Sequence, residues 1–413
     1  MSECPSSLQL PEALCLNGET LTAFYQPIIA MDTRRIIGYE VLGRAVAVMG
    51  DSVRSLGPFF CDEQVPEDDH IVVDRLLREQ AFVKLSAMDE QPMLFINLKP
   101  SWIYRYEEKG ELYTLSLLDK YGIDPKRIVI EITEESFHGS MERLREVVDI
   151  YRARGCLIAI DDVGSGFSST DRIAHIQPNL LKIDIHMIKK SATHDGYFGV
   201  LRSFSDLAEQ IGASLLVEGV ETREDLARSI QAGARYVQGF MFARAEPEFR
   251  EPTCFATIIE AELEQHLLHY VGAERYWLRK SEQLAEQLVE LVNKANVPEQ
   301  KDEWIELLLH ELYDHCIRVY LCNEDGIQLS SNYYRDPDKG WRREEQYRGA
   351  NWSWRPYFVP NLVQLNEKRR AIVSRAYTDL DSHAWIRTVS VLVAPGLILF
   401  MDLKDTERGA QKL

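Results

Sequence analysis

A chain of 413 residues is long enough for two or three domains, one of which can be a barrel of about 250 residues. Its apolar content of 45% is that of an ordinary globular protein, and its net charge of −18 argues against binding nucleic acid, which relies on clustered Lys and Arg. The seven scattered cysteines, the lack of a signal-peptide pattern and the shortness of every apolar run predict a cytoplasmic protein without disulfides, a structural zinc site or membrane contact.

Eight β-rich runs, most of them separated by helical patterns, occupy the first part of the chain. They cover residues 23–29, 35–44, 93–98, 128–133, 157–162, 180–185, 214–220 and 235–240. The first two are too close for a helical crossover and are predicted to pair as an antiparallel hairpin. Later runs are separated by helical stretches such as 140–155, which ends at a candidate cap, Gly155. We therefore predict an α/β fold, a TIM-like (β/α)8 barrel with an irregular antiparallel first strand. An open doubly wound sheet is less favoured, because no glycine-rich phosphate motif opens the chain.

A long helical pattern follows from about residue 257 to 293, with an apolar stripe among Glu, Gln and Lys. A helix packed on the barrel and a connector that also pairs two subunits explain this stripe equally well. Beyond a linker, the run 389–401 is predicted as two strands around the turn at Pro395-Gly396. We expect a barrel over residues 1–255, a connector helix and linker over 256–300, and an α+β domain over 301–413.

Polar residues stand at the ends of the predicted barrel strands from the second strand onward. They are Glu40, Asn97, Glu131, Asp161 with Asp162, Lys182 with Asp184, Glu218 with Glu221 one turn later, and Gln238. In a barrel these ends meet at the face where active sites lie. A single such carboxylate is better explained as a helix N-cap, but the whole series is not. The donors are oxygens without His or Cys, which favours Mg²⁺ or Mn²⁺. They suffice for two ions, an arrangement suited to displacement at phosphorus.

The motifs that contain these residues resemble, in the same order, those of the EAL-domain cyclic di-GMP phosphodiesterases. They read YQPI, YEVLGR, EITE, DDVGSGFSS, LLKID, VEGVET and QGF, over roughly residues 20–245. Val41 stands where the E-A-L-x-R signature has Ala, and Val163 replaces the commoner Phe of D-D-F-G. The resemblance implies hydrolysis of cyclic di-GMP to linear pGpG with two Mg²⁺ or Mn²⁺ ions per site. Because the loop after the two aspartates is otherwise intact, we expect a competent enzyme.

The same resemblance implies a role for each residue of these motifs. Those implied as metal ligands are Glu40, Asn97, Glu131, Asp161 as the bridge, and Asp162 at the second ion. Those implied to hold the dinucleotide are Gln26, Leu42, Arg44, Glu221 and Gln238. Glu218 is implied as the acidic residue near the attacking water, as a ligand or general base, and Lys182 as the lysine that positions or polarises that water. Glu134 is implied to anchor the loop, and Asp184, which alternates with Lys182, is expected on the same side behind the ligands.

The C-terminal domain resembles the PAS and Cache sensor domains, and the two-domain layout is similar to the YkuI type of EAL protein. The segment NWSWRPYF, residues 351–358, carries this resemblance. It implies that Arg355, Tyr357 and Asp379 line a pocket for a small polar ligand, although a purely structural aromatic core is slightly favoured. A homodimer formed through the barrel is expected from the family.

Three functional hypotheses follow from the sequence. The leading one is a metal-dependent cyclic di-GMP phosphodiesterase that its C-terminal domain regulates. The second is a catalytically weak or inactive receptor that binds the dinucleotide and relays the signal to a partner. The third is a metal hydrolase that acts on some other phosphodiester.

Overall fold

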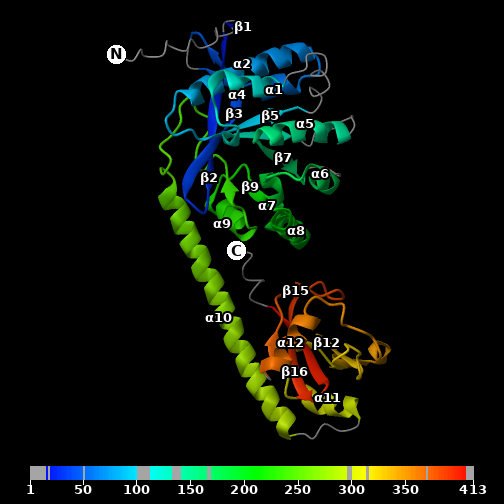
Figure 1. Cartoon of the computed structure of the whole chain (residues 1–413). Coiled ribbons are helices and arrows are strands. Elements are labelled where there is room, and N and C mark those ends of the chain that lie inside the picture. The colour runs from blue at the N-terminus through cyan, green and yellow to red at the C-terminus, as the bar shows by residue number, and fades with distance from the viewer. Residues whose placement is uncertain are drawn as a thin grey trace. The chain divides into compact units, whose positions relative to one another are not determined.

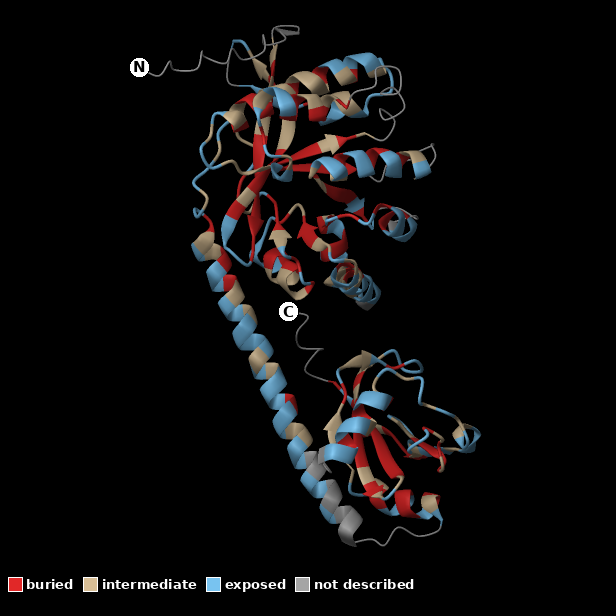
Figure 2. Cartoon of the chain, in the orientation of Figure 1, coloured by how far each residue is buried: buried red, intermediate tan, exposed pale blue. Residues whose placement is uncertain are grey.

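The computed structural model of the chain describes residues 15–16, 19–49, 52–99, 112–132, 141–164, 169–294, 300–312, 316–368 and 371–405. The chain divides into two compact units, Met1–His266 and Leu267–Leu413, and each is described by itself (Figure 1). In both units the buried residues gather on the strands, while the outer faces of the helices are exposed (Figure 2).

The first unit is an eight-stranded barrel. Its strands are β2 (Glu19–Ala30), β3 (Arg35–Ala47), β5 (Met93–Leu98), β6 (Ile128–Ile132), β7 (Leu157–Val163), β8 (Leu180–Ile183), β9 (Ser214–Val217) and β10 (Tyr236–Val237). From β3 through β5 to β10 each strand is parallel to its neighbour. Strand β2 runs antiparallel to both β3 and β10 and closes the barrel, which confirms the predicted fold and its irregular start. Two short strands, β1 (Cys15–Leu16) and β4 (Val53–Ser55), extend the sheet.

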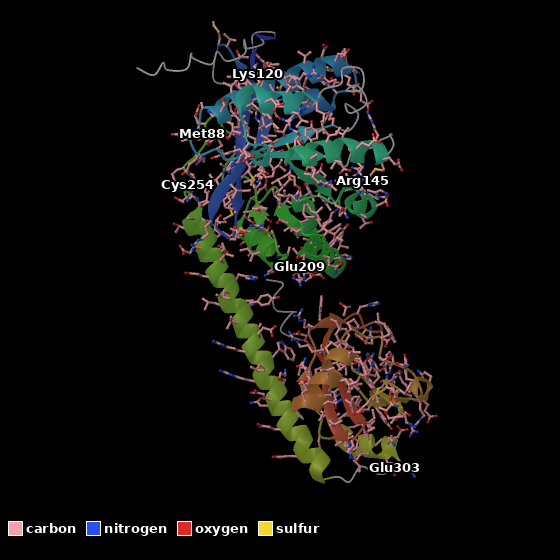
Figure 3. The ribbon with its side chains drawn as sticks, viewed as in Figure 1. Met88, Lys120, Arg145, Glu209, Cys254 and Glu303 are labelled. Atoms are coloured by element: carbon pink, nitrogen blue, oxygen red, sulfur yellow. The ribbon has the colours of Figure 1, made fainter. Side chains whose placement is uncertain are left out.

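Helices cover the outside of the barrel, with charged residues such as Lys120, Arg145 and Glu209 on their exposed faces (Figure 3). They are α1 (Gly57–Cys61), α2 (Glu67–Ser86), α4 (Tyr113–Tyr121), the 3-10 turn η2 (Pro125–Arg127), α5 (Met141–Arg154), α6 (Ser169–Ile176), α7 (Ile185–Ser191), α8 (Asp195–Ile211) and α9 (Arg223–Gln231). Helix α5 buries residues at helical spacing, from Leu144 to Tyr151, against the sheet. It ends at Gly155, whose φ of +101° confirms the predicted glycine stop.

The second unit is built on an antiparallel sheet in the order β13-β12-β11-β17-β16-β14, with β15 also on β16. Its strands are β11 (Cys316–Asn323), β12 (Asn332–Asp336), β13 (Gly340–Glu344), β14 (Ile372–Val373), β15 (Tyr377–Thr378), β16 (Trp385–Ala394) and β17 (Leu397–Lys404). Its helices are α11 (Lys301–Leu309), the 3-10 turn η3 (Glu345–Tyr347) and α12 (Phe358–Lys368). Strands β16 and β17 pair around Gly396, as predicted from their apolar run.

The predicted connector is one helix of 39 residues, α10 (Ala256–Lys294). Its first turns belong to the barrel unit, where Ile259 is fully buried. In the second unit, Trp277 of α10 is buried, and the guanidinium of Arg387 on β16 lies 4.6 Å from the centre of its ring. No helix among the described residues is both long and apolar enough to cross a membrane.

Candidate active site

Side chains alternate between the two faces of each strand, and this alternation directs six of the predicted site residues into the mouth of the barrel. An interior apolar layer is formed by one residue from each of six strands: Ile28, Phe95, Val129, Ala159, Leu180 and Leu216. Because side chains two apart in a strand share a face, the next inward positions on the same six strands hold polar residues. These are Gln26, Asn97, Glu131, Asp161, Lys182 and Glu218. The barrel therefore places residues almost 200 positions apart in one polar layer above an apolar plug.

The ammonium of Lys182 stands at the centre of this layer. Its Nζ lies 2.7 Å from Oε1 of Glu131, 3.1 Å from Oδ2 of Asp161 and 3.3 Å from Oε1 of Glu218. Glu40 is at its edge, with Oε1 at 4.0 Å. The side chains of Lys182 and Glu131 are fully buried. Four carboxylates thus face one fully buried cation.

This excess of negative charge shifts the ionisation of the cluster. Burial raises the pKa of Glu131 and of Glu218 well above the usual carboxyl range, and repulsion from Glu40 and Asp161 adds to it. Burial also acts to raise the pKa of Asp161, but attraction by Lys182 and hydrogen bonds with Lys182, Glu218 and the backbone of Asp162 together outweigh it and lower that pKa. Burial alone would lower the pKa of Lys182, but the carboxylates raise it well above its usual value. The lysine therefore stays charged, and the cluster still lacks positive charge.

Two amides complete the layer around Glu40. Nε2 of Gln238 donates to Oε2 of Glu40 at 2.6 Å, and Nδ2 of Asn97 donates to its Oε1 at 3.3 Å. Gln26, which the resemblance assigns to the substrate, donates from Nε2 to the backbone oxygen of Ala243 at 3.1 Å. The carboxylate of Glu40 on β3 is thus oriented from the neighbouring strand β5 and from the residue that follows β10, on the far side of β2.

The donor set fits a divalent cation. Neither carboxylate oxygen of the fully buried Glu131 accepts a hydrogen bond from another described residue, so this side chain lacks partners other than Lys182. Carboxylate and amide oxygens without His or Cys suit Mg²⁺ or Mn²⁺. In the arrangement that the described residues adopt, no three Asp, Glu, His or Cys side chains are grouped so as to hold a metal ion. Because Lys182 stands among the carboxylates, binding an ion requires these side chains to shift.

The adjacent aspartates diverge. Strand β7 changes register with β8 between Ile160 and Val163, and Asp162 adopts a left-handed φ of +57°. Asp161 is therefore buried toward Lys182, while Asp162 is exposed and donates its backbone N–H to Oδ1 of Asp161 at 2.9 Å. The divergence keeps the two carboxylates from pointing at one another. The predicted loop anchor, Glu134, and loop residues 165–168 lie outside the described residues.

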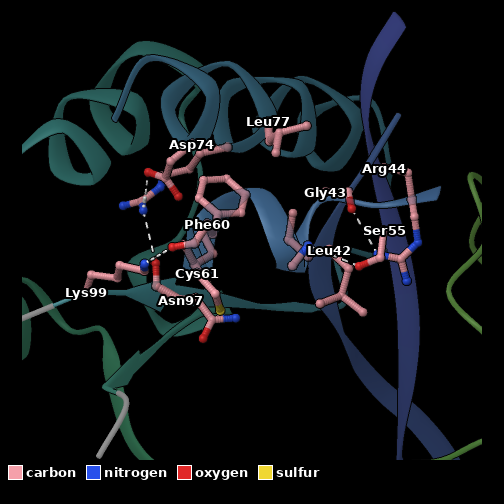
Figure 4. Close-up of a pocket in the computed structure, with 14 residues that line it drawn as sticks. Leu42, Gly43, Arg44, Ser55, Phe60, Cys61, Asp74, Leu77, Asn97 and Lys99 are labelled. Atoms are coloured by element: carbon pink, nitrogen blue, oxygen red, sulfur yellow. Dashed lines mark hydrogen bonds and ion pairs between the residues drawn. The ribbon is translucent and has the colours of Figure 1, made fainter. Parts of the chain in front are cut away.

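Leu42 and Arg44 line a cavity of about 250 Å³ beside the mouth (Figure 4). Strands β3 and β5 form one side of it and helices α1 and α2 the other. Asn97, a member of the polar layer at the end of β5, also lines it, so the cavity lies next to that layer. The sequence reasoning missed three charged residues of this lining: Asp74, Arg78 and Lys99. Asp74 and Arg78 are four apart in α2, a spacing that predicts an ion pair but not its position beside a strand end.

Two predicted residues have other partners in this structure. Asp184 caps helix α7, where its Oδ1 accepts from the backbone N–H of His186 at 2.6 Å. This N-cap explains the residue without any function behind the metal ligands. Glu221 accepts from Nζ of Lys189 at 2.8 Å, and both side chains are about half exposed. Glu221 is therefore accessible at the rim.

In the second unit, the three residues predicted to line a pocket divide into two groups. The guanidinium of Arg355 lies 5.5 Å from the ring centre of Tyr377, and Tyr357 stacks on that ring at 5.3 Å. Asp379 instead binds Arg318, with Nη1 donating to its Oδ1 at 2.8 Å. Because Asp379 is buried and engaged with this internal cation, it is not open to a ligand in this structure.

Comparison with known proteins agrees with this geometry. The family model of the EAL domain matches residues 8–245, and that of the EAL-domain associated signalling protein domain matches residues 251–406. An uncharacterized EAL-domain containing protein of Bacillus subtilis, YkuI, is 34% identical over 404 residues, which are 95% of this chain and 96% of that protein. The cyclic di-GMP phosphodiesterase RocR of Pseudomonas aeruginosa is 31% identical over 258 residues, 60% of this chain and 62% of that protein.

A solved structure also matches almost the whole chain. The crystal structure of Bacillus subtilis YkuI in complex with substrate c-di-GMP and calcium superposes with a TM-score of 0.86, at 33% identity, and covers 94% of this chain and 96% of that one. The agreement therefore extends from the barrel strands through the second unit. With the polar layer at its barrel mouth and the family model over more than half of its length, this chain belongs to the EAL-domain family.

Proposed function

We propose that the barrel hydrolyses one phosphodiester of cyclic di-GMP and releases linear pGpG. The observation that carries the proposal is the meeting of Glu40, Glu131, Asp161 and Glu218 around Lys182 at the barrel mouth. It is supported by RocR, which is named as a cyclic di-GMP phosphodiesterase, and by the complex of YkuI with c-di-GMP and calcium.

The residues of the barrel mouth have three kinds of role: they bind metal ions, position the substrate and transfer a proton. Glu40, Asn97, Glu131, Asp161 and Asp162 would hold two Mg²⁺ or Mn²⁺ ions. Such ions, when bound, supply an activated water and stabilise charge at phosphorus.

The chain's other groups act on the substrate and on the water. Glu218, whose pKa burial raises, is suited to accept and return a proton at neutral pH. Lys182 offsets the charge of its neighbours and donates hydrogen bonds toward the water position. Arg44 offers a forked pair of donors to a phosphate, and Leu42, Gln26, Glu221 and Gln238 contact the rest of the dinucleotide.

Turnover by the purified protein tests the proposal. Cyclic di-GMP is incubated with the full chain and Mg²⁺ or Mn²⁺, and pGpG is followed by anion-exchange chromatography. We expect Glu218→Ala and Asp162→Asn to lower kcat by at least about 100-fold, since each removes a group that acts at the reacting phosphorus. Glu209→Gln, which removes an exposed carboxylate on α8, is the matched control and should keep the parental rate. Parental rates for the first two variants would refute the assigned roles.

A receptor gives a different result in the same samples. Calorimetry that shows tight binding of cyclic di-GMP, with no pGpG formed under either metal, would assign the barrel to binding alone. Hydrolysis of unrelated dinucleotides at equal rates would instead assign it to a less selective phosphodiesterase.

We also propose that the second unit regulates the barrel through a small polar ligand held by Arg355 and Tyr357. Within the described part of the chain, the buried Nε of Arg355 donates no hydrogen bond, and its guanidinium lies over the rings of Trp354 and Tyr377 at 5.1 and 5.5 Å. A screen of small polar metabolites by thermal shift tests this site. A true ligand stabilises the parent but not Arg355→Met, whereas equal stabilisation of both excludes the site.

We propose that two copies of the chain form a homodimer through the exposed apolar residues of α10. Leu267, Leu268 and Leu278 expose 62%, 76% and 60% of their surface in the single chain. Light scattering of the eluting protein should give twice the 47.6 kDa of one chain, and Leu268→Glu should lower that mass. A parental mass equal to one chain would contradict the dimer.

A further inference from the structure

The guanidinium of Arg78 ties helix α2 to the end of strand β5. Arg78 is 2% exposed, and its Nη2 donates to Oδ2 of Asp74 at 2.6 Å and to the backbone oxygen of Asn97 at 3.1 Å. Its Nη1 donates to Oγ1 of Thr114, at the start of α4, at 2.5 Å. Figure 4 shows Asp74 and Asn97 on either side of these bonds. One rigid fork thus links two helices and a strand end.

The bond to Asn97 is made where the sheet offers β5 little support. The pairing of β5 with β3 ends at Phe95, two residues before Asn97. On its other side the strand continues to pair with β6 as far as Leu98. The backbone of Asn97 is therefore held by a strand on one side and by the buried guanidinium in addition.

The hydrogen bond that the side chain of Asn97 donates is too long to fix the amide firmly. Its Nδ2 donates to Oε1 of Glu40 at 3.3 Å, beyond the usual length of such a bond. The position of the amide therefore depends on where the backbone of Asn97 is fixed. That backbone is held by its pairing with β6 and by the bond from Arg78.

We propose that Arg78 is a positioning residue for the metal site, which acts by holding the backbone of Asn97 so that its amide oxygen can bind the ion. The inference rests on the proposed function, because it takes Asn97 as a metal ligand. Partners that orient a metal ligand from behind typically change metal affinity about 10–100-fold when they are removed. The contacts of Arg78 with Asp74 and Thr114 would by themselves serve the packing of α2 and α4.

Titration of Mn²⁺ into the full chain, followed by calorimetry, separates these roles without using turnover. Four proteins are compared with the parent: Arg78→Lys, Asn97→Ala, the double variant, and Thr114→Val as the control. The affinity followed is that of the Mn²⁺ ion whose binding Asn97→Ala weakens. Far-ultraviolet circular dichroism confirms that each protein is folded at the temperature of titration.

We expect Arg78→Lys to weaken Mn²⁺ binding at least about 10-fold, because an ammonium cannot reach Asp74, Asn97 and Thr114 together. Thr114→Val should lower the melting temperature but keep the Mn²⁺ affinity within about twofold. In the Asn97→Ala background, Arg78→Lys should change the affinity less than about twofold, since the residue through which it acts is gone.

Other outcomes overturn the proposal. Parental Mn²⁺ affinity for Arg78→Lys, or an equal loss in both backgrounds, shows that Arg78 does not act through Asn97. If Asn97→Ala by itself leaves Mn²⁺ binding unchanged, Asn97 is not a ligand; the proposal then fails even if the parent still produces pGpG. If Arg78→Lys does not fold, Asp74→Asn, which weakens the hold on the guanidinium, replaces it in the same comparison and must show the same dependence on Asn97.

Discussion

Replacement of Lys182 by Met tests the charge balance of the barrel mouth most directly. Methionine keeps the length and apolar stem of the lysine but removes the ammonium that faces Glu131, Asp161 and Glu218 within 3.3 Å. Glu131 is fully buried and has no other described partner. In the absence of metal, the variant must bury these carboxylates without their cation or keep them protonated.

The size of the effect follows from the burial of the pair. Breaking a buried ion pair by removing one partner costs about 3–5 kcal/mol. The barrel unit ends at His266. With an unfolding entropy of about 2.1 cal/mol/K per residue, this loss lowers its melting temperature by roughly 5–9 °C.

Thermal unfolding of parent and variant, each with EDTA or with excess Mn²⁺, measures this effect. We expect Mn²⁺ to raise the melting temperature of Lys182→Met more than that of the parent, because the ion supplies the positive charge that the variant lacks. Turnover should fall in the variant even when Mn²⁺ restores its stability, because Lys182 also acts on the attacking water.

Lys189→Met is the matched control. Its ammonium pairs with Glu221 at the surface, where both side chains are about half exposed, so the melting temperature of this variant should stay close to that of the parent. The reasoning is refuted if Lys182→Met melts like the parent in EDTA, or if Mn²⁺ stabilises both proteins equally.

Three further predictions concern other parts of the chain. Burial acts to raise the pKa of Asp379, but Arg318 outweighs it and lowers that pKa from 3.8 to about 2; the carboxylate therefore contributes stability above pH 4 that is lost as the pH falls toward 2. The free energy of unfolding of the second unit, measured with denaturant, should fall by about 1–2 kcal/mol over this range. Asp379→Asn should remove that dependence on pH. Gly239→Ala would place the new Cβ 2.1 Å from a backbone oxygen and should lower the free energy of unfolding by about 1–3 kcal/mol, as measured by calorimetry. Gly199→Ala, in open space on α8, should stabilise the protein slightly. Equal effects of the two substitutions would contradict the close packing around Gly239. Arg44→Gln should raise KM for cyclic di-GMP about 10–100-fold with a smaller change in kcat, and an unchanged KM would exclude the phosphate contact.

The amino-acid sequence alone determined the barrel and the membership of its polar layer. Strand alternation and βα spacing are local properties, so the eight strands, the antiparallel start and the stop at Gly155 could be predicted without a structure. The polar residues could be predicted from their place at the ends of these strands, which meet at one face of a barrel. Their motifs, in unbroken order, indicated the EAL family, which the comparisons confirmed.

Tertiary structure alone decided how these side chains are paired. No local pattern shows that Lys182 lies within 3.3 Å of three carboxylates from three other strands, or that Asp184 beside it caps a helix instead. Likewise, the sequence could not place Asp379 against Arg318, 61 residues away. These pairs depend on strand register and helix packing across the fold, and long-range contacts of this kind leave no period in the chain. For the same reason the bond from Arg78 to the backbone of Asn97 became visible only in the folded protein.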